Sequence, residues 1–192
     1  LDVVVKTRVV KRYRIPSLDL KIRQFRTIHE SSLLHEAKQA GVMTPLVYSI
    51  DLGSASIIME FVSGDRLKDV LKGLEPLKLD ELVETLGVLI GRLHRAGIVH
   101  GDLTTSNMIL TLNGEICLLD FGLGERSTDL EARGVDLHIL KTILFSTHYS
   151  IAERCFRSAV NGYKKAVERE EAEAVLRRTD QIGKRGRYVS VR

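Results

Sequence analysis

Cysteine is scarce in this sequence. Only Cys117 and Cys155 occur among 192 residues, and they lie too far apart for a CxxC pair. A structural zinc ion is usually held by four closely spaced ligands, which two distant thiols cannot supply. We therefore expect both thiols to fill an apolar core, in a reducing, intracellular compartment.

Long hydrophobic runs are also missing. Apolar stretches such as 57–62 are far shorter than the roughly 20 residues of a membrane-spanning helix, and no basic-then-apolar leader opens the sequence. We expect a soluble, cytoplasmic protein with no membrane contact. With 44% hydrophobic and 28% charged residues, the composition is globular and excludes disorder and collagen-like structure. The length predicts one or two compact domains.

The charge is small in total but uneven along the chain. The net charge is +4, whereas residues 1–26 carry +6, residues 177–192 carry +5 and the segment between them carries −7. This polarity favours an anionic ligand at the two ends, either a nucleotide phosphate or a nucleic acid backbone. Ordinary solvated surface charge is the alternative.

The first third of the chain predicts a small sheet and one long helix. Residues 1–5 resemble a buried strand that ends near Lys6, and we expect its sheet to include earlier strands outside this sequence. Apolar residues at three- and four-residue steps predict a helix from Pro16 to near Gly41. The runs 45–50 and 56–62, separated by a turn, predict an antiparallel hairpin.

The remainder is mainly helical. A change of pattern near 61–64 indicates a domain boundary, and a strong apolar stripe predicts a helix over 79–93. Asn113-Gly114 joins two short apolar runs into a second hairpin. We expect helices over 135–145 and 151–176, then a Gly- and Arg-rich tail that is extended rather than helical.

The segment 100–107 and the triplet 120–122 carry the strongest chemical signal. Asp102 is followed five positions later by Asn107, and Asp120 stands at the exit of the following hairpin. Phosphoryl transfer needs this arrangement: a base near the acceptor hydroxyl and two oxygen ligands for Mg²⁺. The alternative, an Asp and an Asn that only cap turns around a hairpin, accounts for fewer of the matched residues.

Two further residues fall where a kinase needs them. Val3-Val4-Val5-Lys6 resembles the strand whose Lys pairs with nucleotide phosphates, and Lys11 is the competing choice. The long helix supplies Glu30 as the ion-pair partner of this Lys, with Glu36 as its competitor. A further basic residue and a solvent-exposed Glu are the structural alternatives.

The strand end before the boundary is similar to a kinase hinge. Met59, Glu60 and Val62 lie in the run 59–62, where backbone groups rather than side chains would hydrogen-bond adenine. A core strand with an apolar stripe is compatible with the same residues.

Taken together, these motifs resemble the PRPK family of small atypical kinases of the KEOPS complex, which is related to the RIO kinases. The resemblance extends over nearly the whole chain, and the Leu-Thr-Thr-Ser insert before Asn107 is its most specific part. The matching segments are 6–8, 11–14, 26–30, 100–107, 120–124, 135–137, 146–148 and 185–188.

The resemblance implies an α+β, protein-kinase-like two-lobe fold. Residues 1–62 would form an N-terminal lobe with a small antiparallel sheet and one long helix. Residues 63–182 would form a compact, mainly helical C-terminal lobe that contains the catalytic loop, and 183–192 a basic tail.

The same resemblance implies the functional assignments. Asp102 is the catalytic Asp, Asn107 and Asp120 hold Mg²⁺, and Lys6 and Glu30 form the ion pair of an ATP-binding Ser/Thr kinase with ATPase activity. Family members serve tRNA threonylcarbamoyladenosine synthesis bound to the threonylcarbamoyl transferase subunit of the KEOPS complex, and some are fused behind it. The basic ends would contact tRNA.

The sequence departs from the kinase pattern in two places. The phosphate-covering glycine loop, expected before the strand of Lys6, is not in this sequence. Gly101 replaces the Arg of the common His-Arg-Asp triplet, and no Ala-Pro-Glu follows Gly122. Little room is left for the peptide-binding activation segment of ordinary kinases.

Two other functions remain open at this point. A small-molecule phosphotransferase of the aminoglycoside or choline type shares His-Gly-Asp and the downstream Asn and Asp, but it usually carries a large helical insertion for which 123–192 leave little space. A catalytically idle scaffold is disfavoured because every catalytic position that the sequence covers is filled.

Overall fold

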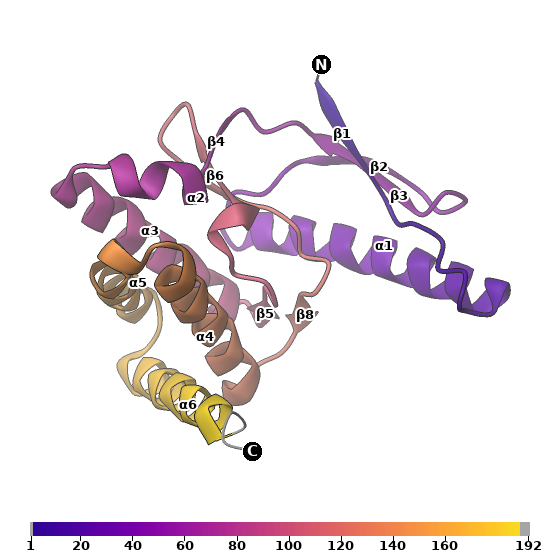
Figure 1. Cartoon of the computed structure of the whole chain (residues 1–192). Helices are drawn as coiled ribbons and strands as arrows, with labels where there is room; N and C mark the ends of the chain where they lie inside the picture. The colour runs from indigo at the N-terminus through magenta and orange to yellow at the C-terminus, as the bar shows by residue number, and fades with distance from the viewer. Residues whose placement is uncertain (1, 189–192) are drawn as a thin grey trace.

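A computed structural model describes residues 2–188 of the chain (Figure 1). The strands are β1 (Val3–Thr7), β2 (Val47–Asp51), β3 (Ser56–Glu60), β4 (Gly64–Arg66), β5 (Ile98–Val99), β6 (Met108–Thr111), β7 (Ile116–Leu118) and β8 (Glu125–Arg126). The helices are α1 (Pro16–Gln39), α2 (Leu67–Val70), α3 (Pro76–Arg95), α4 (Leu130–Thr147), α5 (Ala152–Ala166) and α6 (Arg169–Tyr188).

A three-stranded antiparallel sheet and α1 form the upper right part of the molecule in Figure 1. The strand order is β1-β3-β2, with Lys6 opposite Ile57 and Val4 opposite Met59. The predicted hairpin over 45–62 is therefore confirmed. The first strand differs from its expected burial: Val3, Val4 and Val5 are exposed, because β1 lies at the edge of the described sheet and has a neighbour on one side only.

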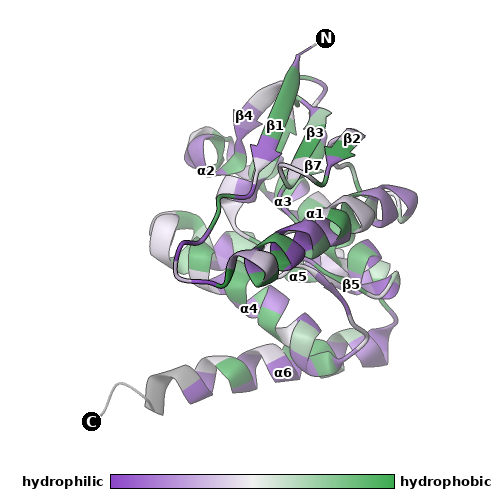
Figure 2. Cartoon of the chain, turned by 90° about the vertical axis from the view of Figure 1, so that its right-hand side faces the viewer, coloured by the Kyte–Doolittle hydropathy of each residue, from purple (hydrophilic) through white to green (hydrophobic). Residues whose placement is uncertain are grey.

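Helix α1 begins and ends where the sequence predicts. Pro16 occupies the first turn, where its missing N–H costs nothing. At the other end Gly41 adopts φ +76°, and its N–H donates to the carbonyl of Lys38. One side of the helix is buried through Leu33 and Leu34. Figure 2 shows the matching alternation of apolar and polar segments along α1, and a largely apolar β3.

Helices α3 and α5 form the most extensive contact between any two described elements. Two glycines allow their backbones to approach closely. A Cβ on Gly87 would lie 1.9 Å from the carbonyl oxygen of Ala159, and a Cβ on Gly162 would lie 1.8 Å from that of Glu84. Both distances are too short for any side chain, so only glycine permits this packing.

The last helices differ from prediction in two ways. The expected single stretch 151–176 is divided at Val167, which is buried in an extended conformation between α5 and α6. The tail expected to be extended from Gly183 continues α6 as far as Tyr188. Packing overrides the local preference of glycine here, because Gly183 lies against the ring of His138 and Arg185 pairs with Glu131 at 2.9 Å. Residues 189–192 of the predicted tail lie outside the described residues.

Both cysteines are buried and free, as predicted. Burial raises the pKa of Cys117 to about 12 and that of Cys155 to about 11, so both remain protonated thiols near neutral pH. Among the described residues, no helix has the length and apolarity required to span a membrane.

The close approach of α3 and α5 yields a stability prediction. Gly87→Ala should lower the free energy of unfolding by about 1–3 kcal/mol, because the added methyl group must push the two backbones apart. Gly73→Ala is the control, since a Cβ there has no atom within 4 Å, and its effect should stay within about 0.5 kcal/mol. Chemical denaturation of the two variants measures both values; equal effects would contradict the packing described.

Candidate active site

A cavity of about 540 Å³ lies between the sheet of β1–β3 and the hairpin of β6 and β7. All six residues that the sequence assigns to nucleotide binding line it: Lys6, Met59, Glu60, Val62, Asn107 and Asp120. Val4, Ile109 and Leu119 add apolar surface, and Glu30 also lines the cavity. The structure thus collects at one place residues that are distributed over more than a hundred positions of the sequence.

Lys6 joins the two parts of the molecule. Its Nζ lies 2.8 Å from Oε1 of Glu30 on α1 and 2.7 Å from Oδ1 of Asp120. The Glu30 side chain is only 1% exposed, and a buried carboxylate needs cationic partners. The alternative residues for this ion pair lie elsewhere. Glu36 pairs with Arg126, and Lys11 does not line this cavity.

Arg8 is a second cation at Glu30, which the sequence analysis did not assign. Its Nη2 lies 2.5 Å from Oε2 of Glu30, so Lys6 and Arg8 each hold one carboxylate oxygen. A strand places residues i and i+2 on the same face, and this rule could have identified Arg8 once Lys6 was chosen. The Glu30 carboxylate is therefore fixed in both position and rotation.

Asp102 and Asn107 are joined directly. The Nδ2 of Asn107 donates hydrogen bonds to Oδ2 of Asp102 at 2.8 Å and to its backbone oxygen at 3.1 Å. Because the amide nitrogen is engaged there, Oδ1 of Asn107 is the atom that remains for a cation. Asp102 itself does not line the cavity.

Asp120 is held in a left-handed backbone conformation, with φ +55°. Asp is one of the few residues that tolerate this region, and such outliers concentrate at functional sites. Burial raises the pKa of the Asp120 carboxyl, but the hydrogen bond and the charge of Lys6 lower it more, and the N–H of Gly122 adds to this effect. The resulting pKa lies below the ordinary value, so Asp120 is ionised at neutral pH.

The backbone before Asp102 is anchored by Asp136, a buried carboxylate on α4. One oxygen accepts the N–H of His100 and the other accepts the N–H of Gly101, each at 2.8 Å. His94 lies between Asp136 and the hydroxyl of Tyr163, at 3.2 and 2.9 Å. The sequence analysis assigned no role to Asp136; a lone carboxylate in an apolar helical stripe was the signal that could have identified it.

The imidazole of His100 is buried against Phe121, with 4.5 Å between the ring centroids. Burial lowers the pKa of His100, although the charge of Asp136 opposes this shift. Its Nδ1 accepts the N–H of Asp102, so Nε2 carries the proton that is donated to the carbonyl of Leu119. A neutral His100 thus connects the loop of Asp102 with the strand that leads to Asp120.

Gly101 is required by the backbone. Its φ is +78°, and a Cβ would lie 2.2 Å from the carbonyl oxygen of Leu123. The common Arg of kinases would therefore not fit at this position without movement of the segment after Gly122.

The predicted hinge, residues 59–62, makes hydrogen bonds within the protein that occupy some of its polar groups. The N–H of Glu60 donates to the carbonyl of Leu46, and the Glu60 carboxylate accepts the N–H of Leu46 at 3.0 Å. The N–H of Glu60 is therefore not free for a ligand. Across the described residues, the N–H of Val62 has no backbone partner, and Val62 lines the cavity.

The donors at this site suit Mg²⁺. Asn107 and Asp120 offer an amide oxygen and a carboxylate from two sides of one cavity. Mg²⁺ prefers oxygen ligands and is usually bound by one or two carboxylates together with substrate phosphates. The short Lys6–Asp120 distance shows that a cation is already stabilised at this carboxylate.

The fold and the site define a protein kinase domain, and comparison with known families agrees: the protein kinase domain model matches residues 5–168. The predicted kinase-like α+β fold is thereby confirmed.

Comparison with individual proteins identifies the family of protein kinases to which the chain is similar. The chain is 45% identical over 188 residues to the KEOPS complex subunit Bud32 of Pyrococcus abyssi, which covers 98% of this chain and 85% of that protein. It is 41% and 39% identical to probable bifunctional tRNA threonylcarbamoyladenosine biosynthesis proteins of Methanothermobacter thermautotrophicus and Methanobrevibacter smithii. These alignments cover 96% and 97% of this chain but only 33% of each bifunctional protein. The chain belongs to the Bud32 family of protein kinases, and the resemblance inferred from its sequence is confirmed.

The Asp136 anchor yields a prediction that does not require activity. Asp136→Asn replaces an acceptor by an amide group, leaving a backbone N–H of the loop without its partner. The amides of His100 and Gly101 should then exchange roughly tenfold faster, as a loss of about 1.4 kcal/mol in local stability implies.

Hydrogen-exchange mass spectrometry of a peptide spanning 98–103 measures this change. Asp180→Asn is the control, because Asp180 is an exposed carboxylate that contacts Lys141 on the far side of α4. Unchanged exchange in the Asp136 variant would show that the loop is held by other contacts.

Proposed function

We propose that this chain is an ATP-dependent Ser/Thr protein kinase with ATPase activity that requires Mg²⁺. The observation that carries the proposal is the pair of ion contacts that Lys6 makes with Glu30 and Asp120, which line one cavity with Asn107, itself hydrogen-bonded to Asp102. Membership of the protein kinase family supports the same reaction class.

Each side chain has a role in this proposal. Lys6 binds nucleotide phosphates and is oriented by Glu30, while the N–H of Val62 and the run 59–62 face the adenine. Asn107 and Asp120 hold Mg²⁺, which supplies charge stabilisation to the transferring phosphoryl group. Asp102 accepts the proton of the attacking hydroxyl, and the hydrogen bond from Asn107 fixes its orientation.

We place the lobe boundary between residues 62 and 63. In support, β3 ends at Glu60 in the sheet with β1, whereas β4 begins at Gly64 and pairs with β6 in a separate sheet. Residues 1–62 then form the N-terminal lobe and 63–182 the C-terminal lobe. Lys6 and Glu30 come from the first, and Asp102, Asn107 and Asp120 from the second.

We infer further that the chain supports tRNA threonylcarbamoyladenosine modification as a KEOPS-complex subunit in the cytoplasm. The names of its relatives support this inference, since they include a KEOPS complex subunit and proteins of that biosynthesis. The expected partner is the threonylcarbamoyl transferase subunit, and the bifunctional relatives are three times the length of this chain, as a fusion with such a domain would be.

The basic N-terminal segment supports contact with tRNA. None of these relatives favours a small-molecule phosphotransferase or an idle scaffold.

Substitution of Asp120 tests the proposed reaction. Asp120→Ala removes a ligand charge and the partner of Lys6, and ATP turnover should fall by at least about tenfold, or ~1.4 kcal/mol of transition-state stabilisation. Asp102→Ala should retain some ATPase activity, because positioning and charge stabilisation supply most of the catalysis.

The matched control is Asp69→Ala, an exposed carboxylate on α2 outside the cavity. ATP hydrolysis is measured for the chain alone and with tRNA and the transferase subunit added. A rate for Asp120→Ala within twofold of the control in both conditions would refute the assignment. We expect tRNA and the transferase subunit together to stimulate ATP hydrolysis. If they do not, the proposed role in tRNA modification is contradicted, whereas the proposed ATPase activity is not.

A further inference from the structure

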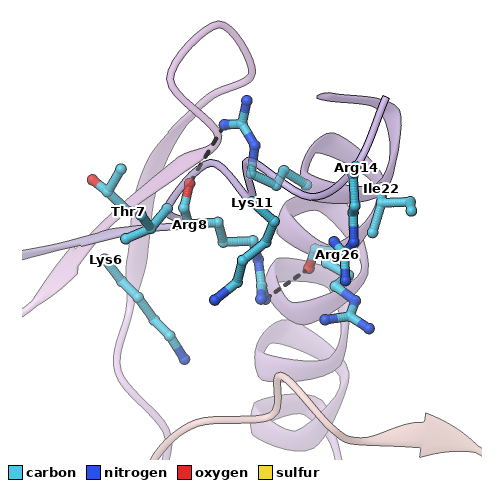
Figure 3. A pocket seen from close by; sticks show the side chains of 9 residues that line it. Lys6, Thr7, Arg8, Lys11, Arg14, Ile22 and Arg26 are labelled. Carbon is cyan, nitrogen blue, oxygen red and sulfur yellow. Dashed lines mark hydrogen bonds between the residues drawn. The ribbon is translucent and has the colours of Figure 1, made fainter. Parts of the chain in front are cut away.

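A second concave site, which we call the basic pocket, lies where the segment after β1 faces the beginning of α1 (Figure 3). Its volume is about 240 Å³, and no acidic residue lines it. Six of its nine lining residues are cationic: Lys6, Arg8, Lys11, Arg14, Arg23 and Arg26. Lys6 also lines the larger cavity, so the basic pocket adjoins the candidate active site.

The positive charge of the basic pocket is only partly compensated. Arg23 and Arg14 share the carboxylate of Asp19, at 2.8 and 3.4 Å. Lys6 and Arg8 share Glu30. Lys11 and Arg26 have no carboxylate within ion-pair distance anywhere in residues 2–188, and both are exposed. Water screens the charge of these exposed groups, but no carboxylate of the described residues offsets it.

Arg8 provides an independent observation. Its Nη2 bonds to Glu30 and to the backbone oxygen of Arg26, but its buried Nε has no hydrogen-bond partner in the described part of the chain. A buried guanidinium N–H without an acceptor is costly and requires an explanation. Figure 3 shows Arg8 and Lys11 extending side by side toward the space next to α1, with Arg14 and Arg26 on the helix side. Backbone oxygens of Arg26 and Arg8 accept from the guanidinium groups of Arg8 and Arg23, but the Nε of Arg8 is left without an acceptor.

We propose that the basic pocket binds a phosphate monoester dianion, either inorganic phosphate or the phosphoryl group of a phosphorylated Ser or Thr in a protein. A tetrahedral dianion offers several acceptor oxygens and matches the two uncompensated charges of Lys11 and Arg26. The cations come from β1, the following loop and α1 and converge on one small space. A nucleic acid strand, with a single charge on each successive phosphate, suits cations spaced along a track, so the tRNA contact proposed above is assigned to the exposed cations of this segment outside the pocket, Arg12 and Lys21.

The position of the pocket suggests what the dianion does. It would tie the loop after β1 to α1 through Arg8 and Arg26, and so hold together the two elements that carry Lys6 and Glu30. The closeness of the basic pocket to a phosphoryl group being transferred rests on the proposed function. The binding of the dianion to the pocket does not depend on that function and can be measured without ATP turnover.

The test compares two double variants of the full chain. Lys11→Ala/Arg26→Ala removes the uncompensated charges, and Arg12→Ala/Lys21→Ala removes equal charge at exposed neighbouring positions that do not line the pocket. Each protein is first saturated with Mg²⁺ and a non-hydrolysable ATP analogue, which fills the larger cavity. Calorimetry then measures binding of inorganic phosphate, of a phosphoseryl peptide with its unphosphorylated form, and of a single-stranded RNA oligonucleotide.

The parent chain and the control should bind phosphate or phosphopeptide within about twofold of each other, and the pocket variant at least about tenfold more weakly. Tighter binding of the phosphopeptide would identify a protein as the source of the dianion, and tighter binding of inorganic phosphate would identify free phosphate. Equal affinities of the two variants would overturn the proposal. So would RNA binding that depends on Lys11 and Arg26 while neither phosphate nor phosphopeptide binds, since the site would then recognise phosphodiesters.

Discussion

Glu30 is a carboxylate with 1% of its side chain exposed, and a buried charge of this kind is tolerated only when cations are brought to it. Lys6 and Arg8 from β1 meet this demand, one at each oxygen. Because Lys6 also contacts Asp120, the same pairing fixes the sheet, α1 and the segment after β7 relative to one another. The shape of the nucleotide cavity and the position of the basic pocket both follow from this arrangement.

Asp136 is the corresponding buried carboxylate in the C-terminal lobe. A second buried carboxylate holds two backbone N–H groups of the loop that leads to Asp102, and His94 and Tyr163 complete its surroundings. Burial raises the pKa of Tyr163, so its hydroxyl remains protonated and can donate. Packing between α3 and α5, which only glycine at 87 and 162 permits, brings His94 and Tyr163 together. The loop that leads to Asp102 therefore depends on the packing of α3 against α5.

Much of this arrangement was predictable from the sequence, and the exceptions have physical causes. Periodicity and turn residues predicted α1, α3 and the two hairpins, because these signals are local. The helical continuation past Gly183 was missed, since the contacts of Gly183 with His138 and of Arg185 with Glu131 are tertiary. Spacing within motifs predicted which residues meet at the cavity. Arg8 and Asp136 received no role, because strand alternation and a lone carboxylate in a helical stripe are weak signals until the burial of Glu30 and Asp136 is known.

The coupling between Lys6 and Glu30 is the most direct test of this account. A double-mutant cycle with Lys6→Met, Glu30→Gln and both together, read out as the affinity for Mg²⁺ and a non-hydrolysable ATP analogue, measures it by calorimetry. If Glu30 acts by positioning Lys6, the two losses should be non-additive by about 1 kcal/mol or more. Losses that add to within about 0.3–0.5 kcal/mol would show that the two residues act independently and would contradict the central role of the ion pair.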